Sequence, residues 1–152
     1  MRAEEFKALF QALIHNQDNP YHPLVCVRGS PQIGTGCKIG FFSELFAKNA
    51  RLVIGDHCDI GSFVAINVAD SHWRCLELSD SIVYRDIVIG DHVFIGSHCA
   101  VLGGAVIGHH SVIGAGSIVR AGTIPPYSLV IGDRVRPGYY AGRCAPQTTG
   151  PK

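Results

Sequence analysis

One stretch decides the fold of this chain, namely residues 87–119, IVIGDHVFIGSHCAVLGGAVIGHHSVIGAGSIV. An aliphatic residue followed by glycine recurs through it at intervals of six residues or multiples of six. A small or medium residue follows each aliphatic residue by four positions. This period matches neither an α-helix nor the plain alternation of a strand. It fits short strands joined by tight turns, where glycine supplies the backbone freedom that each corner needs.

The repeat extends beyond this stretch in both directions. Between Ile89 and Ile131 the six-residue register runs without a slip, so it predicts that Pro125 and Ile131 face inward. Two interruptions break the register, one of three residues before Ile54 and a longer one after Ile66. The aliphatic–glycine pairs are Ile33-Gly34, Ile39-Gly40, Ile54-Gly55, Ile60-Gly61, Ile89-Gly90, Ile95-Gly96, Ile107-Gly108, Ile113-Gly114 and Ile131-Gly132.

The composition agrees with a compact, glycine-punctuated β protein. Ile and Val together number 29 against 9 Leu, and β-branched residues favour strands. Charged residues make up only 16% of the chain, and the net charge of +1 gives no electrostatic case for binding nucleic acid. No run of 18 apolar residues exists, and the N-terminal residues lack the apolar run of a signal peptide. We therefore expect a cytoplasmic protein with no membrane span and with reduced cysteines.

We expect a single domain over residues 1–152. Its body is an all-β, parallel β-helix over residues 31–136, with a loop excursion around residues 67–87. A short α-helix over residues 2–16 precedes the β-helix, and a Pro/Gly-rich tail over residues 137–152 follows it. The helix is amphipathic and is expected to cover one end of the β-helix with its apolar face, which comprises Phe6, Leu9, Phe10, Leu13 and Ile14.

The same register interprets the cysteines and most of the histidines. Cys37, Cys58 and Cys99 occupy the small inward position, so we expect them in the core. Four histidines lie three places after an aliphatic residue, where solvated turns are expected, and these are His57, His92, His98 and His110. A zinc site made from them is a weaker interpretation. The predicted site contains no metal.

The repeat resembles that of the left-handed parallel β-helix acyltransferases, and the resemblance covers residues 31–136. Its nearest likeness is to the galactoside, maltose and polysaccharide sugar O-acetyltransferases. The resemblance implies a left-handed solenoid in which three hexapeptides make one triangular coil. It also implies acetyl-CoA as co-substrate and a homotrimer whose active sites are shared between neighbouring subunits. The residues that match the acetyl-CoA site of the family are Phe94, Ser97, Gly114, Ala115, Gly116, Ser117 and Pro125.

The long interruption carries the candidate catalytic residues. The step from Ile66 to Ile89 exceeds one full coil by five positions, and the segment between them abandons the repeat. It contains His72, with Asp70 two positions before it. An imidazole takes a proton from a hydroxyl near neutral pH, and a neighbouring carboxylate orients the ring. In the family that the repeat resembles, the loop histidine is the general base, and it matches His72.

Further residues complete the predicted site. The chain from Arg120 onward is basic, so Arg120 and Arg136 are expected to bind the phosphates of acetyl-CoA. Ser43, Trp73 and Tyr84 are the candidates for contacts with the acceptor, although Trp73 and Tyr84 equally suit an anchoring role in the loop.

The predicted activity is acetyl-CoA-dependent O-acetylation of a sugar or saccharide hydroxyl, by direct transfer with His72 as base. The alternative is an N-acetyltransferase acting on an amino sugar or sugar nucleotide, in which an unprotonated amine attacks without a histidine. Two other classes stay open: a carbonic-anhydrase-like metalloprotein and a β-helix that serves only as an assembly surface.

Overall fold

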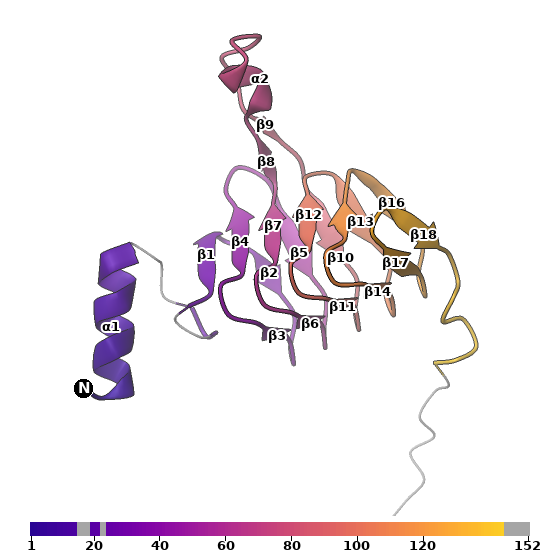
Figure 1. Ribbon diagram of the computed structural model, residues 1–152, viewed down its shortest axis with the longest axis horizontal. Helices are drawn as coiled ribbons and strands as arrows, with labels where there is room; N and C mark the ends of the chain where they lie inside the picture. The colour runs from indigo at the N-terminus through magenta and orange to yellow at the C-terminus, as the bar shows by residue number, and fades with distance from the viewer. Residues whose placement is uncertain (15–18, 22–23, 145–152) are drawn as a thin grey trace, which may run out of the picture.

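The computed structural model describes residues 1–14, 19–21 and 24–144, and most of these form a parallel β-solenoid (Figure 1). A helix, α1 (Ala3–Ile14), precedes the solenoid, and a one-turn helix, α2 (His72–Cys75), interrupts it. The strands are β1 (Cys26–Gly29), β2 (Gln32–Ile33), β3 (Lys38–Ile39), β4 (Glu44–Ala47), β5 (Leu52–Ile54), β6 (Asp59–Ile60), β7 (Ala65–Asn67), β8 (Ala69–Asp70), β9 (Val83–Tyr84), β10 (Ile87–Ile89), β11 (Phe94–Ile95), β12 (Ala100–Leu102), β13 (Ala105–Ile107), β14 (Val112–Ile113), β15 (Ile118–Val119), β16 (Gly122–Ile124), β17 (Leu129–Ile131) and β18 (Arg134–Arg136).

The strands form three long sheets, one for each side of the solenoid. Sheet A has the order β1-β4-β7-β12-β15, sheet B the order β16-β13-β10-β5-β2, and sheet C the order β18-β17-β14-β11-β6-β3. Successive strands of the chain lie in successive sheets, so each coil adds one strand to every sheet. Apart from β18, the strands within these sheets pair in parallel. The fold is the hexapeptide-repeat β-helix that the sequence predicts.

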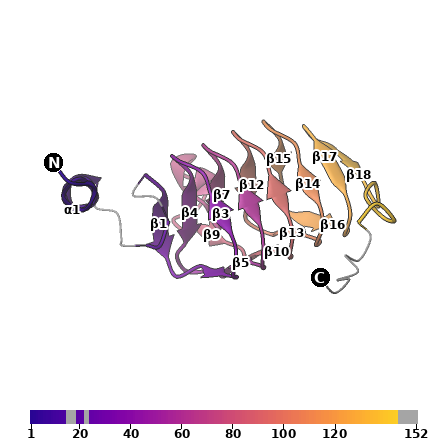
Figure 2. The same ribbon diagram turned by 90° about the horizontal axis from the view of Figure 1, so that it is seen from below.

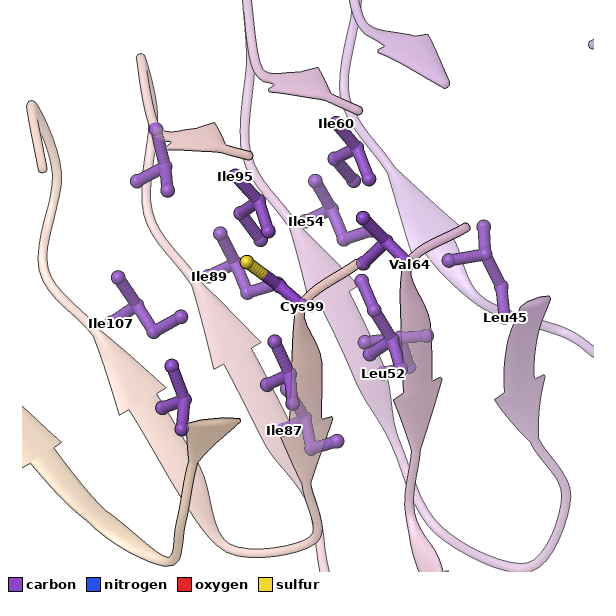
Figure 3. Close-up of a cluster of buried hydrophobic side chains, with 14 of the residues drawn as sticks. Leu45, Leu52, Ile54, Ile60, Val64, Ile87, Ile89, Ile95, Cys99 and Ile107 are labelled. Carbon is purple, nitrogen blue, oxygen red and sulfur yellow. The ribbon is translucent and has the colours of Figure 1, made fainter. Parts of the chain in front are cut away.

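The core is a stack of inward-facing aliphatic side chains that runs along the solenoid (Figure 3). In sheet C, Ile39 pairs with Ile60, Ile60 with Ile95, and Ile95 with Ile113, so identical side chains stack from coil to coil. The prediction for the small inward positions is confirmed at Cys58 and Cys99, which are buried, whereas Cys37 is only half-buried. Burial raises the pKa of the Cys58 thiol to about 11, which keeps it protonated at neutral pH.

The two interruptions are insertions at corners and leave the sheets intact. Ile66 lies in sheet A, and Ile89, the next aliphatic residue at the six-residue spacing, lies in sheet B, the sheet that follows directly. The two residues are therefore one step of the repeat apart, not one coil apart. Almost a whole coil's length of chain is inserted into this single step, and it forms the loop excursion that the sequence predicts around residues 67–87. An insertion at a corner costs the ladder no hydrogen bond.

The predicted register fails in the last coil. Ile107 pairs with Ile124 and Ile113 with Val130, so this coil is one residue shorter than the others. Ile124 and Val130 are buried in place of Pro125 and Ile131, which are exposed. A one-residue change of register moves every side chain of a strand to its other face. The prediction that Pro125 and Ile131 face inward is therefore wrong.

The N-terminal helix is confirmed, but its role as an end cap is not. Helix α1 stands apart from β1 (Figure 2), and Leu13 on its apolar face is 69% exposed. The first coil is covered instead by the segment before β1. There the amide of Asn19 donates to the carbonyl of Val25 at 3.2 Å, and Tyr21 packs against the core. Residues 15–16 of the predicted helix lie outside the described residues.

The C-terminal end departs from the predicted coil register. Strand β18 turns back and pairs antiparallel with β17, with Arg136 opposite Leu129. Arg136 therefore lies in a capping hairpin, and its predicted place within a coil is wrong. An antiparallel last strand covers the edge of sheet C, which limits pairing with another chain. The part of the predicted tail from residue 145 onward lies outside the described residues.

Turn residues stack into aromatic ladders at two corners. His57, His92 and His110 each adopt a positive φ of 55°, and their rings follow one another at 5.2 and 4.7 Å between centroids. At the corner between sheets C and A, Phe63 stacks on His98 at 4.9 Å. The prediction that these histidines occupy turns is confirmed. Among the described residues, no group of three His, Cys, Asp or Glu side chains is placed to hold a metal ion.

The shifted register predicts opposite outcomes for two isoleucines of sheet C. Ile113→Ala removes a fully buried side chain and should lower the free energy of unfolding by about 2–5 kcal/mol. Ile131→Ala changes a side chain that is 56% exposed and should cost less than about 0.5 kcal/mol. Urea unfolding followed by circular dichroism measures both. Equal losses would contradict the shift and restore the unbroken six-residue register.

Candidate active site

The insertion forms an arm that projects from the solenoid at the corner between sheets A and B (Figure 1). Its two sides pair as the antiparallel ribbon β8–β9, with Ala69 opposite Tyr84, and α2 closes the tip. The base of the arm is fixed by backbone hydrogen bonds to both sides of the insertion. The N–H of Arg85 donates to the carbonyl of Val68 at 2.9 Å, and the N–H of Gly104 donates to that of Asp86 at 3.0 Å.

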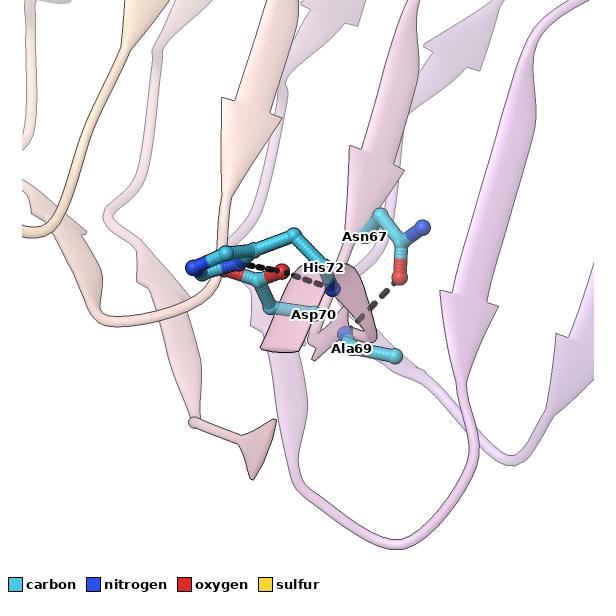
Figure 4. A network of polar contacts seen from close by, with 4 residues as sticks. All are labelled: Asn67, Ala69, Asp70 and His72. Carbon is cyan, nitrogen blue, oxygen red and sulfur yellow. Dashed lines mark hydrogen bonds and ion pairs between the residues drawn. The ribbon is translucent and has the colours of Figure 1, made fainter. Parts of the chain in front are cut away.

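His72 and Asp70 meet in this arm as a hydrogen-bonded pair (Figure 4). The Nδ1 atom of His72 lies 2.5 Å from Oδ1 of Asp70, and the backbone N–H of His72 donates to the same oxygen at 3.1 Å. At the start of the arm, the side chain of Asn67 accepts the N–H of Ala69 at 2.8 Å. Because a carboxylate only accepts hydrogen bonds, Nδ1 carries the proton. The lone pair therefore lies on Nε2, which points away from Asp70 and is available as a base.

The environment of Asp70 favours its ionised form. The hydrogen bonds from the ring and the backbone N–H of His72 lower the pKa of this carboxyl below its ordinary 3.8, and the positive charge of Arg85 acts in the same direction. Asp70 thus stays negative throughout the neutral range. When the imidazole of His72 takes up a proton, the negative charge of the neighbouring Asp70 carboxylate stabilises it.

A groove of about 380 Å³ lies between the base of the arm and the solenoid. Asp70 lines one side of it, and two arginines, Arg85 from the arm and Arg120 from the end of β15, line it as well. The remaining lining is mostly apolar and comprises Val68, Ala69, Val83, Leu102, Gly103 and Ala121. Arg120 also lines two further hollows, one of them beside Gly116, and Asp133 lines both of these.

The two residues of the arm that are predicted to contact the acceptor, Trp73 and Tyr84, have different surroundings. Trp73 follows His72 on α2, is 48% exposed, and has its ring centroid 5.3 Å from that of the imidazole. It is therefore placed to contact whatever approaches His72. Tyr84 is half-buried and packs against the hydrophobic core, which fits an anchor for the arm.

The predicted cofactor residues gather at a different corner, between sheets C and A. The carbonyl of Ser97 accepts the N–H of Gly116 at 2.9 Å, so the turns of neighbouring coils are stacked. Gly96 is required there because a Cβ atom would come within 2.5 Å of the backbone nitrogen of Ala115. Within the described part of the chain, no acceptor takes the N–H of Ser97. The backbone nitrogen of Ser97 lies against Gly61 of the preceding coil, 2.7 Å from where a Cβ atom on that glycine would stand.

Arg136 lies on the outer face of sheet C, in a row of residues that starts next to this corner. Phe94 pairs with Val112, Val112 with Leu129, and Leu129 with Arg136, so all four lie in one row. Three steps between neighbouring strands put Arg136 about 14 Å from Phe94. A ligand that extends from Ser97 along this row therefore meets a cation at its far end.

Three other predicted site residues do not present their side chains in the groove or at the Ser97 corner. Ser43 is 1% exposed, and its hydroxyl donates to the carbonyl of Gly61 at 2.9 Å inside the solenoid. Ser117 is also buried, and its hydroxyl accepts the N–H of Gly132 at 3.0 Å. Pro125 lies at the corner between sheets B and C, because it is in the turn from β16 to β17. The side chains of Ser43 and Ser117 are therefore closed to a ligand.

Within one chain the two halves of the predicted site are apart. The turn at Ser97 precedes β12, and Gly103, which lines the groove beside Asp70, follows it. The extended strand between these two positions spans up to about 20 Å. Arg85 lines the groove, although no motif in the sequence singles it out. The only signal for it is the adjacent Gly103-Gly104 pair, which provides space for a neighbouring side chain.

Comparison with known proteins supports the repeat architecture. The family model described as bacterial transferase hexapeptide (six repeats) matches residues 86–121. A hexapeptide-repeat acetyltransferase from Vibrio cholerae, solved with acetyl coenzyme A, is 26% identical over 90% of this chain and 76% of that chain, with a TM-score of 0.50. The search of curated proteins found no match. The predicted resemblance to the hexapeptide-repeat acetyltransferases is thus confirmed.

Two further solved structures share the fold. An N-acyltransferase from Bacillus cereus, in complex with dTDP and coenzyme A, is 21% identical, with a TM-score of 0.66 over 74% of this chain and 65% of that chain. This chain therefore spans slightly less than two thirds of its length. A maltose O-acetyltransferase from Clostridium difficile is 22% identical, with a TM-score of 0.54 over 88% of this chain and 81% of that chain.

No helix in the described residues is long and apolar enough to cross a membrane.

The His72–Asp70 pair predicts a measurable titration. In the wild type the carboxyl of Asp70 should titrate below 3.8, and in His72→Ala its pKa should rise towards that value because the ring donor is lost. Since the folded-state pKa is lowered, the pair stabilises the arm above this range and ceases to do so as the pH falls through the folded value. Carboxyl carbon NMR shifts measure the titration. Identical curves in the two proteins would contradict the bond.

Proposed function

We propose that the protein is an acyltransferase that moves the acetyl group of acetyl-CoA to a hydroxyl of a sugar or saccharide, with His72 as general base. The observation that carries the proposal is the bond between Nδ1 of His72 and Asp70, which in the neutral ring places the lone pair on Nε2. The likeness to the Vibrio cholerae acetyltransferase supports acetyl-CoA as the donor. The fold is shared with O-acetyltransferases and N-acyltransferases alike, so the oxygen acceptor rests on the histidine.

The reaction is a direct transfer. Nε2 of His72 takes the proton of the acceptor hydroxyl as its oxygen attacks the carbonyl carbon of the thioester. The C–S bond breaks, the thiolate of CoA leaves, and it receives the proton from the imidazolium, so an ester and a free thiol result. Asp70 holds the ring in one tautomer and stabilises the imidazolium. The backbone N–H of Ser97 would stabilise the negative charge that develops on the carbonyl oxygen.

The cofactor half of the site is proposed to run from the corner between sheets C and A. Phe94, Ser97, Ala115 and Gly116 would line the pantetheine arm, with Gly114 and Ser117 contributing backbone only. Arg136 would meet the phosphates at the end of the row, because guanidinium groups bind phosphate bidentately. Pro125 is not included, since it lies at the corner between sheets B and C. Arg120 lies in the groove beside Asp70, so we place it on the acceptor side of the site.

We further propose that the active site is completed by a second copy of the chain in a homotrimer. The distance between the His72 arm and the Ser97 corner in one chain supports this, because a direct transfer requires the reacting atoms within about 3.5 Å. A neighbouring subunit that presents its Ser97 corner to the arm would bring the two halves together.

The role of His72 is tested by turnover. His72→Ala should lower kcat at least about 100-fold while leaving the Kd for acetyl-CoA unchanged, because the base acts only on the acceptor. The matched control is His57→Ala, which removes an exposed histidine from the corner between sheets B and C and should leave turnover unchanged. Mass spectrometry of sugars incubated with acetyl-CoA gives both rates and product. Near-normal turnover in His72→Ala would refute the base, and a product that resists hydroxylamine would indicate N-acetylation instead.

The shared site is tested by mixing two inactive variants. His72→Ala lacks the base, and Ala115→Trp blocks the stacked corner beside Gly96. When the two are co-expressed and purified together, mixed trimers contain sites with both halves intact, so part of the wild-type activity should return. Sedimentation of the wild type should give the mass of three chains. A monomer at micromolar concentration, or no recovery in verified mixed trimers, would contradict the shared site.

A further inference from the structure

The groove beside the His72 arm contains an excess of positive charge that the proposed transfer does not use. Two guanidinium groups, those of Arg85 and Arg120, line it against a single carboxylate, Asp70. Among the described residues neither arginine forms an ion pair, whereas Arg51 at the base of the arm is paired with Asp86 at 2.8 Å. Asp70 already accepts two hydrogen bonds from His72. The lining of this groove therefore has one more positive charge than negative charge while His72 is neutral.

The position of Arg85 is fixed by its surroundings. Its backbone N–H is bonded to Val68, and its side chain lies along Gly103 and Gly104. A Cβ atom on Gly103 would come within 3.3 Å of Cβ of Arg85, and one on Gly104 would come within 3.4 Å of its Cδ. The aliphatic stem thus occupies the space that two glycines leave open. A side chain held in this way loses less conformational entropy when its guanidinium binds a ligand.

We propose that this groove binds an anionic group, a carboxylate or a phosphate, carried by the saccharide acceptor. The inference rests on the proposed function and names the class of its acceptor. Arginine recognises both groups through paired N–H donors, and two arginines give the groove a net charge of +1 while His72 is neutral. A volume of about 380 Å³ suits a single small-molecule unit. The ring of the acceptor then lies between this anchor and Nε2 of His72.

The expected consequence is a preference for charged sugars. A charge-assisted hydrogen bond contributes about 1.5–3 kcal/mol, which corresponds to a factor of about 10 to 150 in kcat/KM. A neutral sugar makes no such contact in the groove. The acceptor specificity of this chain would therefore depend on Arg85 and Arg120, in addition to the aromatic surface of Trp73.

The experiment compares hexoses with their own charged derivatives. Glucose, galactose and mannose are tested against the corresponding uronic acids and 6-phosphates, at fixed acetyl-CoA, with wild type, Arg85→Gln and Arg74→Gln. Arg74 lies on α2 and does not line the groove, so it is the matched control for loss of one charge from the arm. The wild type should prefer at least one charged class by about tenfold or more. Arg85→Gln should lose that preference, because turnover of the charged sugar falls more than turnover of the neutral hexose, and Arg74→Gln should keep it.

Each other outcome overturns the inference. Equal or faster turnover of neutral hexoses in the wild type would refute the anionic acceptor while leaving acetyl transfer intact. An equal loss for charged and neutral sugars in Arg85→Gln, with a raised KM for acetyl-CoA, would assign Arg85 to the phosphates of the donor. If no sugar is acetylated, NMR titration decides separately: glucuronate or glucose 6-phosphate should shift the Arg85 side-chain signal, glucose should not, and the absence of any shift refutes the site.

Discussion

The stacking of each coil on the next is the constraint on which the rest of this molecule depends. An aliphatic side chain at the centre of each strand is buried only by the equivalent side chains of the coils before and after it, as at Ile60, Ile95 and Ile113. Each coil is therefore stable only in register with its neighbours. Chain added at a corner leaves this contact unchanged, which explains why a short insertion and a long one interrupt the sequence pattern and not the sheets.

The same constraint separates rigid from variable parts of the candidate site. The Ser97 corner consists of turns locked together by stacking, where Gly96 allows the backbone of Ala115 to approach. The His72 arm is the inserted segment and is held only at its base, through Val68, Tyr84 and Arg85. A rigid stacked corner and a projecting arm thus arise from one repeat. Their separation in a single chain is the physical reason to expect a contribution from a second copy.

The sequence predicted the repeat, its strands and the core positions because a period of six recurs far too often for chance. It also predicted the His72–Asp70 pair, since residues two apart on an irregular segment interact locally. It failed where a single residue was lost: Ile131 and Pro125 keep the spacing of six, yet the shortened last coil turns both outward. The buried position of Ser43 follows from the same register, since it lies four positions after Ile39.

By itself, then, the sequence determined the solenoid, the place of the insertion and the pairing within the arm, because each depends on short-range spacing or on a strict period. The tertiary structure decided which distant residues face one another. Arg85 and Arg120 are far apart in the chain and have no motif in common, yet both line the groove beside Asp70. The exposed face of α1 and the reversed strand β18 were decided in the same way. Such contacts depend on the number of residues at each corner. The repeat pattern does not specify which residues of neighbouring segments meet there.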